Sequence, residues 1–102
     1  MYYVWLVGNC LENNTDYFGG DFNGSCANQP TSWRRDTPVE CQLLCQEVFG
    51  CGSFTWIDIN TPLWEKDRKR CCLKRKHQRT QYVKGVVSGP STCGTTVSKN
   101  EP

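Results

Sequence analysis

Cysteine content places the tightest constraint on how this chain can fold. Eight cysteines occur in 102 residues, at Cys10, Cys26, Cys41, Cys45, Cys51, Cys71, Cys72 and Cys93. An even number at this density in a short chain predicts a disulfide framework, and such frameworks persist in oxidising compartments. We therefore expect a secreted, extracellular or cell-surface protein. The alternative is a zinc site, but the cysteines lack paired Cys-x2-Cys spacing and the chain has one histidine.

The length of the chain predicts one small domain. Hydrophobic residues make up 37% of it, so the core is modest, and disulfides stabilise such a fold by roughly 2–4 kcal/mol each. No apolar run approaches the ~20 residues that cross a bilayer, so we expect no membrane insertion. The apolar stretch 2–7 lacks the other parts of a signal peptide. We expect either that a signal was removed or that the chain is one module of a larger multidomain protein.

A helix is predicted from Thr37 to Gly50. Thr37 is suited to the N-cap position, Pro38 to the first helical position, and Glu40 completes a capping box. Gly50 is a typical residue just beyond a helix C-terminus. The spacing i, i+3, i+4, i+7 places four residues on one helix face, namely Cys41, Leu44, Cys45 and Val48. Both cysteines of this helix should therefore point into the core.

Short strands are predicted around this helix, at residues 2–7, 52–58, 70–76 and 82–87. In the second of them, Phe54 and Trp56 alternate with smaller residues, which is typical of a half-buried strand. Loops and turns are predicted at residues 9–28, 60–69 and 88–90. We expect an α+β fold, in which an antiparallel sheet packs on a single α-helix. The domain should span residues 1–94, with a flexible C-terminal tail at residues 95–102.

Five sequence fragments occur in order along the chain: Tyr17-x-Gly19-x-Asp21, Glu40-Cys41-Gln42-x-x-Cys45, Gly50-Cys51-x-x-Phe54-x-Trp56, Cys71-x-Leu73-Lys74, and Gly85-Val86-Val87-Ser88-Gly89 ahead of Cys93. Together, at these spacings, they resemble the PAN/apple domain family over nearly the whole chain. The resemblance implies an antiparallel sheet cradling one helix, in agreement with the predicted elements. It also implies a non-catalytic recognition module that binds proteins or carbohydrates.

The resemblance also narrows the 105 ways in which eight cysteines can pair. The family pattern implies three disulfides: Cys10–Cys93, Cys41–Cys71 and Cys45–Cys51. Cys26 and Cys72 depart from that pattern and are left over together. Adjacent residues of a strand point to opposite faces, so Cys72 faces outward if Cys71 faces the helix. The long loop that carries Cys26 could cross there, and we predict a fourth bridge, Cys26–Cys72.

A basic segment is the sharpest candidate for a binding site. Nine of the twelve Lys and Arg residues lie between Lys66 and Lys84, opposed locally only by Asp67. Several cations on one surface bind polyanions, and this predicts a heparin-like sulfated glycan as ligand, for which the family holds a precedent. The candidate residues are Arg68, Lys69, Arg70, Lys74, Arg75, Lys76 and Arg79. The alternative is that strand alternation scatters these charges, and that Lys74 belongs to the structural motif Cys71-x-Leu73-Lys74.

Aromatic residues offer a second candidate surface. Tyr17, Trp33 and Trp64 could stack on the apolar side of sugar rings, whereas the alternation with Phe54 places Trp56 in the core. Loop tryptophans are equally common as anchors of protein interfaces. The sequence therefore leaves two ligand classes open, an extracellular glycan and a protein bound in adhesion or matrix assembly. A third class is a secreted antagonist of adhesion or coagulation, although no reactive loop marks it.

Catalytic chemistry is not indicated by the sequence. The one histidine, His77, lies among cations without a paired nucleophile, and we interpret it as a solvated surface side chain. We therefore expect no enzyme activity, no cofactor, no metal and no nucleic-acid partner. Two Asn-x-Ser/Thr triplets, at Asn13 and Asn23, are candidate glycosylation sites and fit the same compartment.

Overall fold

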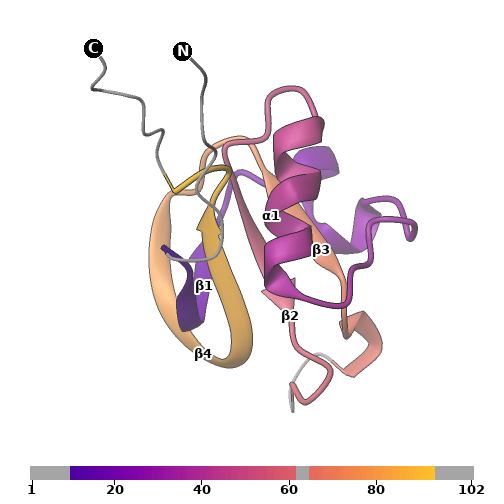
Figure 1. The fold of residues 1–102 in the computed structure, drawn as a ribbon, viewed down its shortest axis with the longest axis vertical. Helices are drawn as coiled ribbons and strands as arrows, with labels where there is room; N and C mark the ends of the chain where they lie inside the picture. The colour runs from indigo at the N-terminus through magenta and orange to yellow at the C-terminus, as the bar shows by residue number, and fades with distance from the viewer. Residues whose placement is uncertain (1–9, 62–64, 94–102) are drawn as a thin grey trace, which may run out of the picture.

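The computed structural model describes residues 10–61 and 65–93. In chain order its elements are β1 (Glu12–Phe18), the 3-10 turns η1 (Phe22–Gly24) and η2 (Cys26–Asn28), α1 (Pro38–Glu47), β2 (Ser53–Ile57), η3 (Glu65–Asp67), β3 (Cys71–Lys74) and β4 (Arg79–Pro90). The four strands form one antiparallel sheet in the order β1-β4-β2-β3. Helix α1 lies across β2 and β3 on one face of this sheet (Figure 1). This is the predicted α+β architecture. The strand predicted at 2–7 and the tail at 95–102 lie outside the described residues.

Helix α1 begins where the capping signals predicted. The Thr37 hydroxyl accepts a hydrogen bond from the Glu40 backbone N–H at 3.1 Å, and the Glu40 carboxylate accepts one from the Asp36 N–H at 3.1 Å. The helix ends at Glu47, three residues before the predicted stop at Gly50. Gly50 has φ +86°, a left-handed conformation that glycine adopts without strain.

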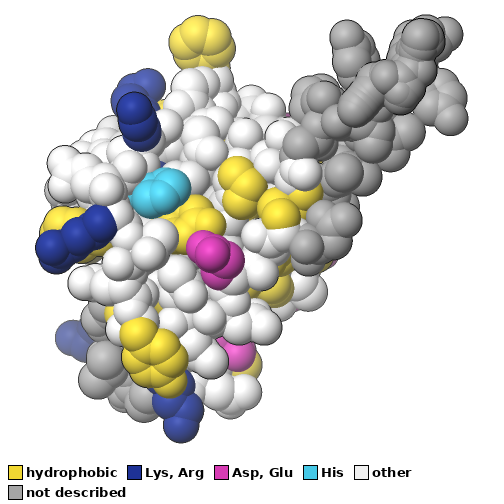
Figure 2. Space-filling view, turned by 90° about the vertical axis from the view of Figure 1, so that its left-hand side faces the viewer, with side chains coloured by type: hydrophobic (Ala, Val, Ile, Leu, Met, Phe, Trp, Pro, Cys, Tyr) yellow, Lys and Arg dark blue, Asp and Glu magenta, His cyan; other side chains and the backbone are white. Residues whose placement is uncertain are grey.

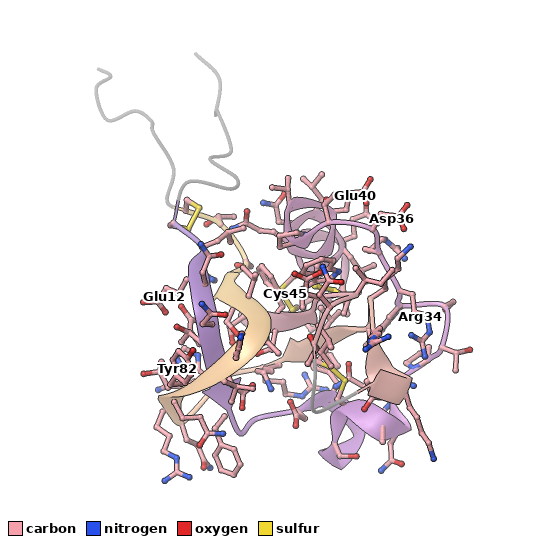
Figure 3. The ribbon with its side chains drawn as sticks, turned by 90° about the horizontal axis from the view of Figure 1, so that it is seen from below. Glu12, Arg34, Asp36, Glu40, Cys45 and Tyr82 are labelled. Atoms are coloured by element: carbon pink, nitrogen blue, oxygen red, sulfur yellow. A yellow bond between two sulfur atoms is a disulfide. The ribbon has the colours of Figure 1, made fainter. Side chains whose placement is uncertain are left out.

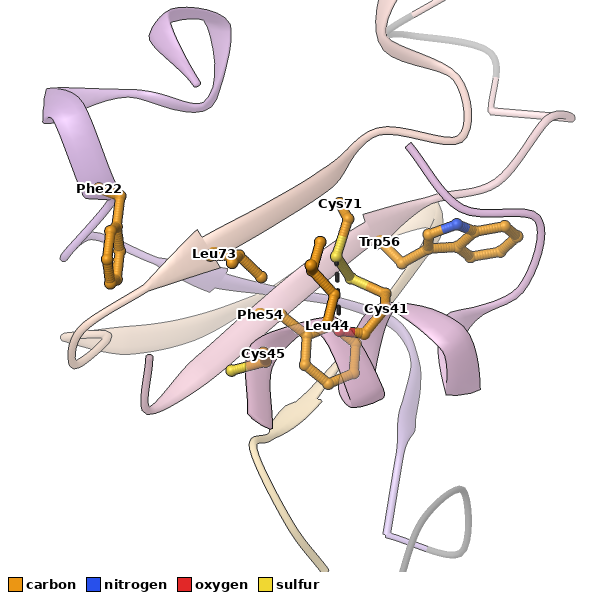
Figure 4. Close-up of a cluster of buried hydrophobic side chains, with 8 residues drawn as sticks. All are labelled: Phe22, Cys41, Leu44, Cys45, Phe54, Trp56, Cys71 and Leu73. Carbon is orange, nitrogen blue, oxygen red and sulfur yellow. Dashed lines mark hydrogen bonds between the residues drawn. A yellow bond between two sulfur atoms is a disulfide. The ribbon is translucent and has the colours of Figure 1, made fainter. Parts of the chain in front are cut away.

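The main hydrophobic core fills the space between α1 and the sheet (Figure 4). It consists of Phe22, Cys41, Leu44, Cys45, Phe54, Trp56, Cys71 and Leu73. The predicted apolar stripe of the helix supplies three of these side chains, and Val48 packs at their edge. The indole N–H of Trp56 donates to the backbone oxygen of Arg35 at 2.9 Å, so the one polar atom of that ring is satisfied.

Strand β2 is buried on both faces, so the expectation of a half-buried strand was wrong. All of its residues, Ser53–Ile57, are buried. The strand lies between β3 and β4, with α1 on one face. On the other face Ile57 packs with Cys72 and Val86 in a second apolar cluster. The hydroxyl oxygens of Thr55 and Ser88 lie 2.7 Å apart on the same strand pair, which satisfies two buried polar groups.

Two segments predicted as loop or turn are strands. The looped region expected at 9–28 contains β1, which pairs with β4 at the edge of the sheet. The pairing shifts register at Asn14, whose φ is +54° and whose side-chain oxygen accepts from the Gly85 N–H at 2.9 Å. The turn expected at 88–90 is instead the end of β4, and Pro90 pairs there with Ser53. Proline is tolerated at such a strand end because it need not donate to the ladder.

Four disulfides tie these elements together, and all eight cysteines are used in them. The pairs are Cys10–Cys93, Cys26–Cys72, Cys41–Cys71 and Cys45–Cys51, the same four expected from the sequence. The first joins the two ends of the described chain, and the second pins the loop after β1 to the outer face of the sheet. The third ties α1 to β3, and the fourth closes the loop after α1. No thiolate is left for a zinc ion.

Candidate functional site

The basic segment does not form one surface, because two of its cations are buried in ion pairs. Arg70 is 7% exposed, and its Nε lies 3.0 Å from the Asp67 carboxylate. Lys74 is 4% exposed, and its ammonium contacts the carboxylate of Asp21. Neither charge is free to meet a large polyanion. These two candidates therefore support the fold. For Lys74 this agrees with the alternative interpretation, in which it belongs to a structural motif.

Strand β3 divides the remaining cations into two groups. Arg68 and Lys69 precede the strand and are half-buried. The Lys69 ammonium lies 3.0 Å from the carboxylate of Asp36, which neutralises it. The guanidinium of Arg68 donates to the Thr61 backbone oxygen at 3.3 Å. This first group is therefore engaged in local contacts at the far end of β3 from the second group.

The second group follows β3 and is exposed. It consists of Arg75, Lys76 and Arg79, which we call the turn cations. The Arg75 guanidinium lies over the Phe22 ring, 4.3 Å from its centroid. That of Arg79 lies over the Phe18 ring, 4.7 Å from its centroid. Cation–π stacking of this kind holds a guanidinium in place while leaving its N–H groups free to donate.

The turn that carries these cations is fixed against the end of β1. The Arg75 N–H donates to the Gly20 backbone oxygen at 2.9 Å, and the Gln78 N–H donates to the Phe18 oxygen at 2.8 Å. Gly20 has φ +73°, and a Cβ there would lie 2.1 Å from the Lys76 backbone oxygen. Only glycine fits so close an approach of two backbones. The backbone of the turn that carries these cations is therefore held rigidly against the end of β1.

Figure 2 shows the face of the molecule on which the histidine lies, with Lys and Arg side chains and apolar side chains around it. His77 is half-buried, contrary to the expectation of a solvated side chain. Its ring stacks on that of Tyr17 with centroids 4.0 Å apart, and its Nδ1 lies 3.2 Å from the Ser53 hydroxyl. His77 therefore packs the turn onto the sheet.

The candidate aromatic residues do not form an open stacking surface. Tyr17 is buried, and its hydroxyl donates to the Glu12 carboxylate at 2.6 Å. Burial raises the pKa of the Tyr17 phenol well above its usual value, and this hydrogen bond raises it further. Trp33 is half-buried and meets the Phe22 ring edge-on at 6.2 Å between centroids. Trp64 lies outside the described residues.

Two exposed aromatic residues went unnoticed in the sequence. Phe49 is 97% exposed and lies in the loop closed by the Cys45–Cys51 disulfide. Tyr82 is 75% exposed on β4, and Figure 3 places it at the outer side of the β1–β4 ribbon. Phe49 belongs to no motif, and Tyr82 belongs only to the strand predicted at 82–87, which did not indicate that its side chain is exposed.

A groove of about 360 Å³ runs along α1 from Glu40 to Glu47, on the side where Figure 3 labels Arg34, Asp36 and Glu40. The Arg34 guanidinium donates to the backbone oxygens of Arg68 and, at 3.4 Å, of Lys66. Glu40 caps the helix. Arg34 and Glu40 of this groove are therefore used to hold the chain that enters α1.

The two candidate glycosylation sites are both exposed. Asn13 lies on the edge strand β1. Asn23 lies in η1 with φ +60°, and its amide donates to the Asn28 backbone oxygen at 3.3 Å. A glycan on either residue would lie on the surface of the domain. Glycosylation at both positions stays a prediction.

These features define a class: a small α+β domain held by four disulfides, with no group of His, Cys, Asp and Glu in residues 10–61 and 65–93 that could hold a metal ion. No helix in the same two segments is long and apolar enough to cross a membrane. The PAN domain family matches residues 10–97, and the chain belongs to that family. PAN domains are generally non-catalytic modules that bind proteins or carbohydrates. Among curated proteins, none matches this chain.

Proposed function

We propose that this domain is an extracellular recognition module that binds a sulfated glycan through the turn cations. The observation that carries the proposal is that Arg75 and Arg79 are each stacked on an aromatic ring at one short turn. The four disulfides support an extracellular location, because such bonds persist in oxidising compartments. The aromatic candidates are not part of this proposed site, because Tyr17 is buried and Trp33 is half-buried against Phe22.

Rigid arginines suit sulfate groups for a physical reason. A guanidinium presents several N–H donors in a planar fork, and it can bind an anionic oxyacid through two parallel hydrogen bonds. A side chain already held on a ring loses less conformational entropy when it binds. The Lys76 ammonium adds a third charge between the two arginines in sequence. Glycan sulfates would then be bound chiefly by charge, so affinity should fall as salt rises.

Heparin affinity chromatography tests this proposal with a matched pair of variants. Changing the three turn cations to glutamine should lower heparin affinity on the order of 100-fold at low salt, because each cation near an anionic surface contributes about 1 kcal/mol. The control variant Lys66→Gln/Lys69→Gln/Lys84→Gln removes the same charge elsewhere and should elute close to the wild type. Equal losses in both variants, or no retention of the wild type at physiological salt, would refute the assignment to the turn.

A protein partner is the second candidate function, and Phe49 favours it. An almost fully exposed phenylalanine has no role in packing its own domain, and the disulfide-closed loop fixes its position. Rigid, exposed aromatic residues are frequent energetic anchors of protein interfaces.

The variant Phe49→Ala separates this candidate from the first. Its free energy of unfolding should change by no more than about 0.5 kcal/mol, as for other exposed positions, and its heparin retention should be unchanged. Capture of a binding protein from extracellular fluid should be lost. Undiminished capture by the Phe49→Ala domain would exclude Phe49 as the anchor.

A further inference from the structure

A pocket lies on the face of the sheet opposite α1. Its floor is formed by Thr55 and Ile57 of β2 with Cys72 and Lys74 of β3. These residues alternate with Phe54, Trp56, Cys71 and Leu73, which face the helix. The volume is about 260 Å³, whereas one water occupies about 30 Å³ of liquid. The pocket therefore has room for a side chain and not merely for a bridging water.

The walls combine apolar surface with carboxylates. Phe18, Ile57 and the Cys26–Cys72 disulfide supply the apolar part. Three carboxylates line the pocket, and two of them are paired with cations: Asp21 with Lys74, and Asp67 with Arg70.

Asp16 is the third carboxylate, and it has no cation. It is only 7% exposed, and one of its oxygens accepts from the Gln81 amide at 3.0 Å. No ion pair joins it to any Lys or Arg in residues 10–61 and 65–93. The nearest arginine along the paired strand, Arg79, is stacked on Phe18. Burying a carboxylate without a positive partner is costly, so such groups are frequent at binding sites.

We propose that this pocket binds the side chain of a lysine from a protein partner. The ammonium would meet the Asp16 carboxylate, and the methylene stem would lie along Phe18, Ile57 and the disulfide. A sulfated sugar is disfavoured there because the charges lining the pocket sum to a negative value. A neutral sugar would leave the charge of Asp16 uncompensated. The site adjoins the turn cations, because Phe18 is also the ring on which Arg79 stacks, but the ligand it would bind is a different one.

Nuclear magnetic resonance titration with Nα-acetyl-L-lysine N-methylamide tests the proposal on the disulfide-bonded domain. Saturable shift changes are expected at Asp16, Ile57 and Gln81. The norleucine analogue, which lacks the ammonium, should cause none. In the variant Asp16→Asn the affinity should fall by about tenfold or more, because the ammonium would meet a neutral amide oxygen in place of a carboxylate, and hydrogen bonds between ionised groups are about twice as strong as neutral ones.

The variant Asp36→Asn serves as the control, because it removes the same charge from an exposed carboxylate outside the pocket. Its affinity for the lysine probe should equal that of the wild type. If Asp16→Asn does not fold, the comparison of the lysine and norleucine probes on the wild type still decides the matter. Equal binding of both probes, no saturable shift with the lysine probe, or shifts confined to another surface would overturn the proposal. Heparin retention of Asp16→Asn should match the wild type.

Discussion

Replacing Cys41 and Cys71 together by alanine is expected to lower the free energy of unfolding by about 4 kcal/mol or more. Their disulfide closes a sequence separation of 30 residues, which contributes about 3–4 kcal/mol through the entropy of the unfolded chain. Both cysteines are 0% exposed, so their removal also leaves a cavity in the main core. A domain of this size has a total stability of about 5–15 kcal/mol, and much of it would be lost.

The other disulfides provide the controls for this prediction. The Cys45–Cys51 bond has a separation of only 6, and the same entropy argument gives about 2 kcal/mol. The Cys26–Cys72 bond has a sequence separation of 46. By entropy alone, its stabilising contribution would exceed that of the Cys41–Cys71 bond by about 0.4 kcal/mol. Cys26 is half-buried and lies beside the smaller apolar cluster, so we expect the cavity term to reverse that order.

Thermal unfolding of the three alanine pairs measures the order directly. The variant without Cys41–Cys71 should melt about 15–30 °C below the wild type, and the variant without Cys45–Cys51 should show the smallest loss. A Cys26–Cys72 variant less stable than the Cys41–Cys71 variant would show that loop closure outweighs packing in this fold.

Local signals were sufficient to predict the helix and three of its buried residues, Cys41, Leu44 and Cys45, but not the fully buried Gln42. Thr37, Pro38 and Glu40 act within one turn of chain, so their effect does not depend on the rest of the fold. The buried stripe follows from helical periodicity alone. The positions of the core strands around Phe54 and Leu73 were also predicted correctly, because the hydrophobic residues of these strands are themselves a local signal.

Strand β1 could not be predicted because its stability comes from its neighbour. Its residues Glu12–Asp16 are polar or β-neutral and suggest a loop. They form a strand because β4 offers a ladder of hydrogen-bonding groups, and an edge strand can carry polar side chains toward water. The length of β4 was underestimated for the same reason, since Gly89 and Pro90 pair with β2.

The site was predictable only in part. Of the basic run, Arg75, Lys76 and Arg79 are exposed in the structure, and the motif Cys71-x-Leu73-Lys74 had already suggested a structural role for Lys74, but nothing in the sequence indicated that Arg70 turns inward to a carboxylate. The contact of Arg70 with Asp67 is local and depends on the turn that also joins their backbones, whereas the contact of Lys74 with Asp21 joins residues 53 positions apart, so it appears only in the folded chain. The Asp16 pocket is of the same kind, because its walls come from four separate segments.

The ion pair between Asp21 and Lys74 joins two of the five sequence fragments that resemble the PAN/apple family. The first ends at Asp21 and the fourth at Lys74, 53 positions apart. The two residues also form a backbone β-bridge, so the pair fastens the loop after β1 to the end of β3. The Lys74 side chain is 4% exposed and that of Asp21 is 22% exposed. The pair therefore lies largely out of water.

Changing Asp21 to asparagine is expected to lower the free energy of unfolding by about 3–5 kcal/mol, because it leaves a buried ammonium without its counter-charge. The shape of the side chain is retained, so the loss would report on charge and not on packing. The double variant Asp21→Asn/Lys74→Met should recover most of the stability, since an apolar side chain of similar volume suits a buried position. Urea unfolding followed by tryptophan fluorescence measures all three proteins.

Asp36→Asn is the matched control, because it makes the same substitution in an ion pair that is exposed. The side chains of Lys69 and Asp36 are 42% and 77% exposed, and such pairs contribute about 0–1 kcal/mol. Only the Asp21 variant should therefore be strongly destabilised, and only it should be rescued by a change at Lys74. Similar small losses in both single variants would mean that water reaches the Lys74 ammonium. In that case the loop after β1 would be held by the Cys26–Cys72 disulfide, its hydrogen bonds to Leu73 and the packing of Phe22, without a contribution from this ion pair.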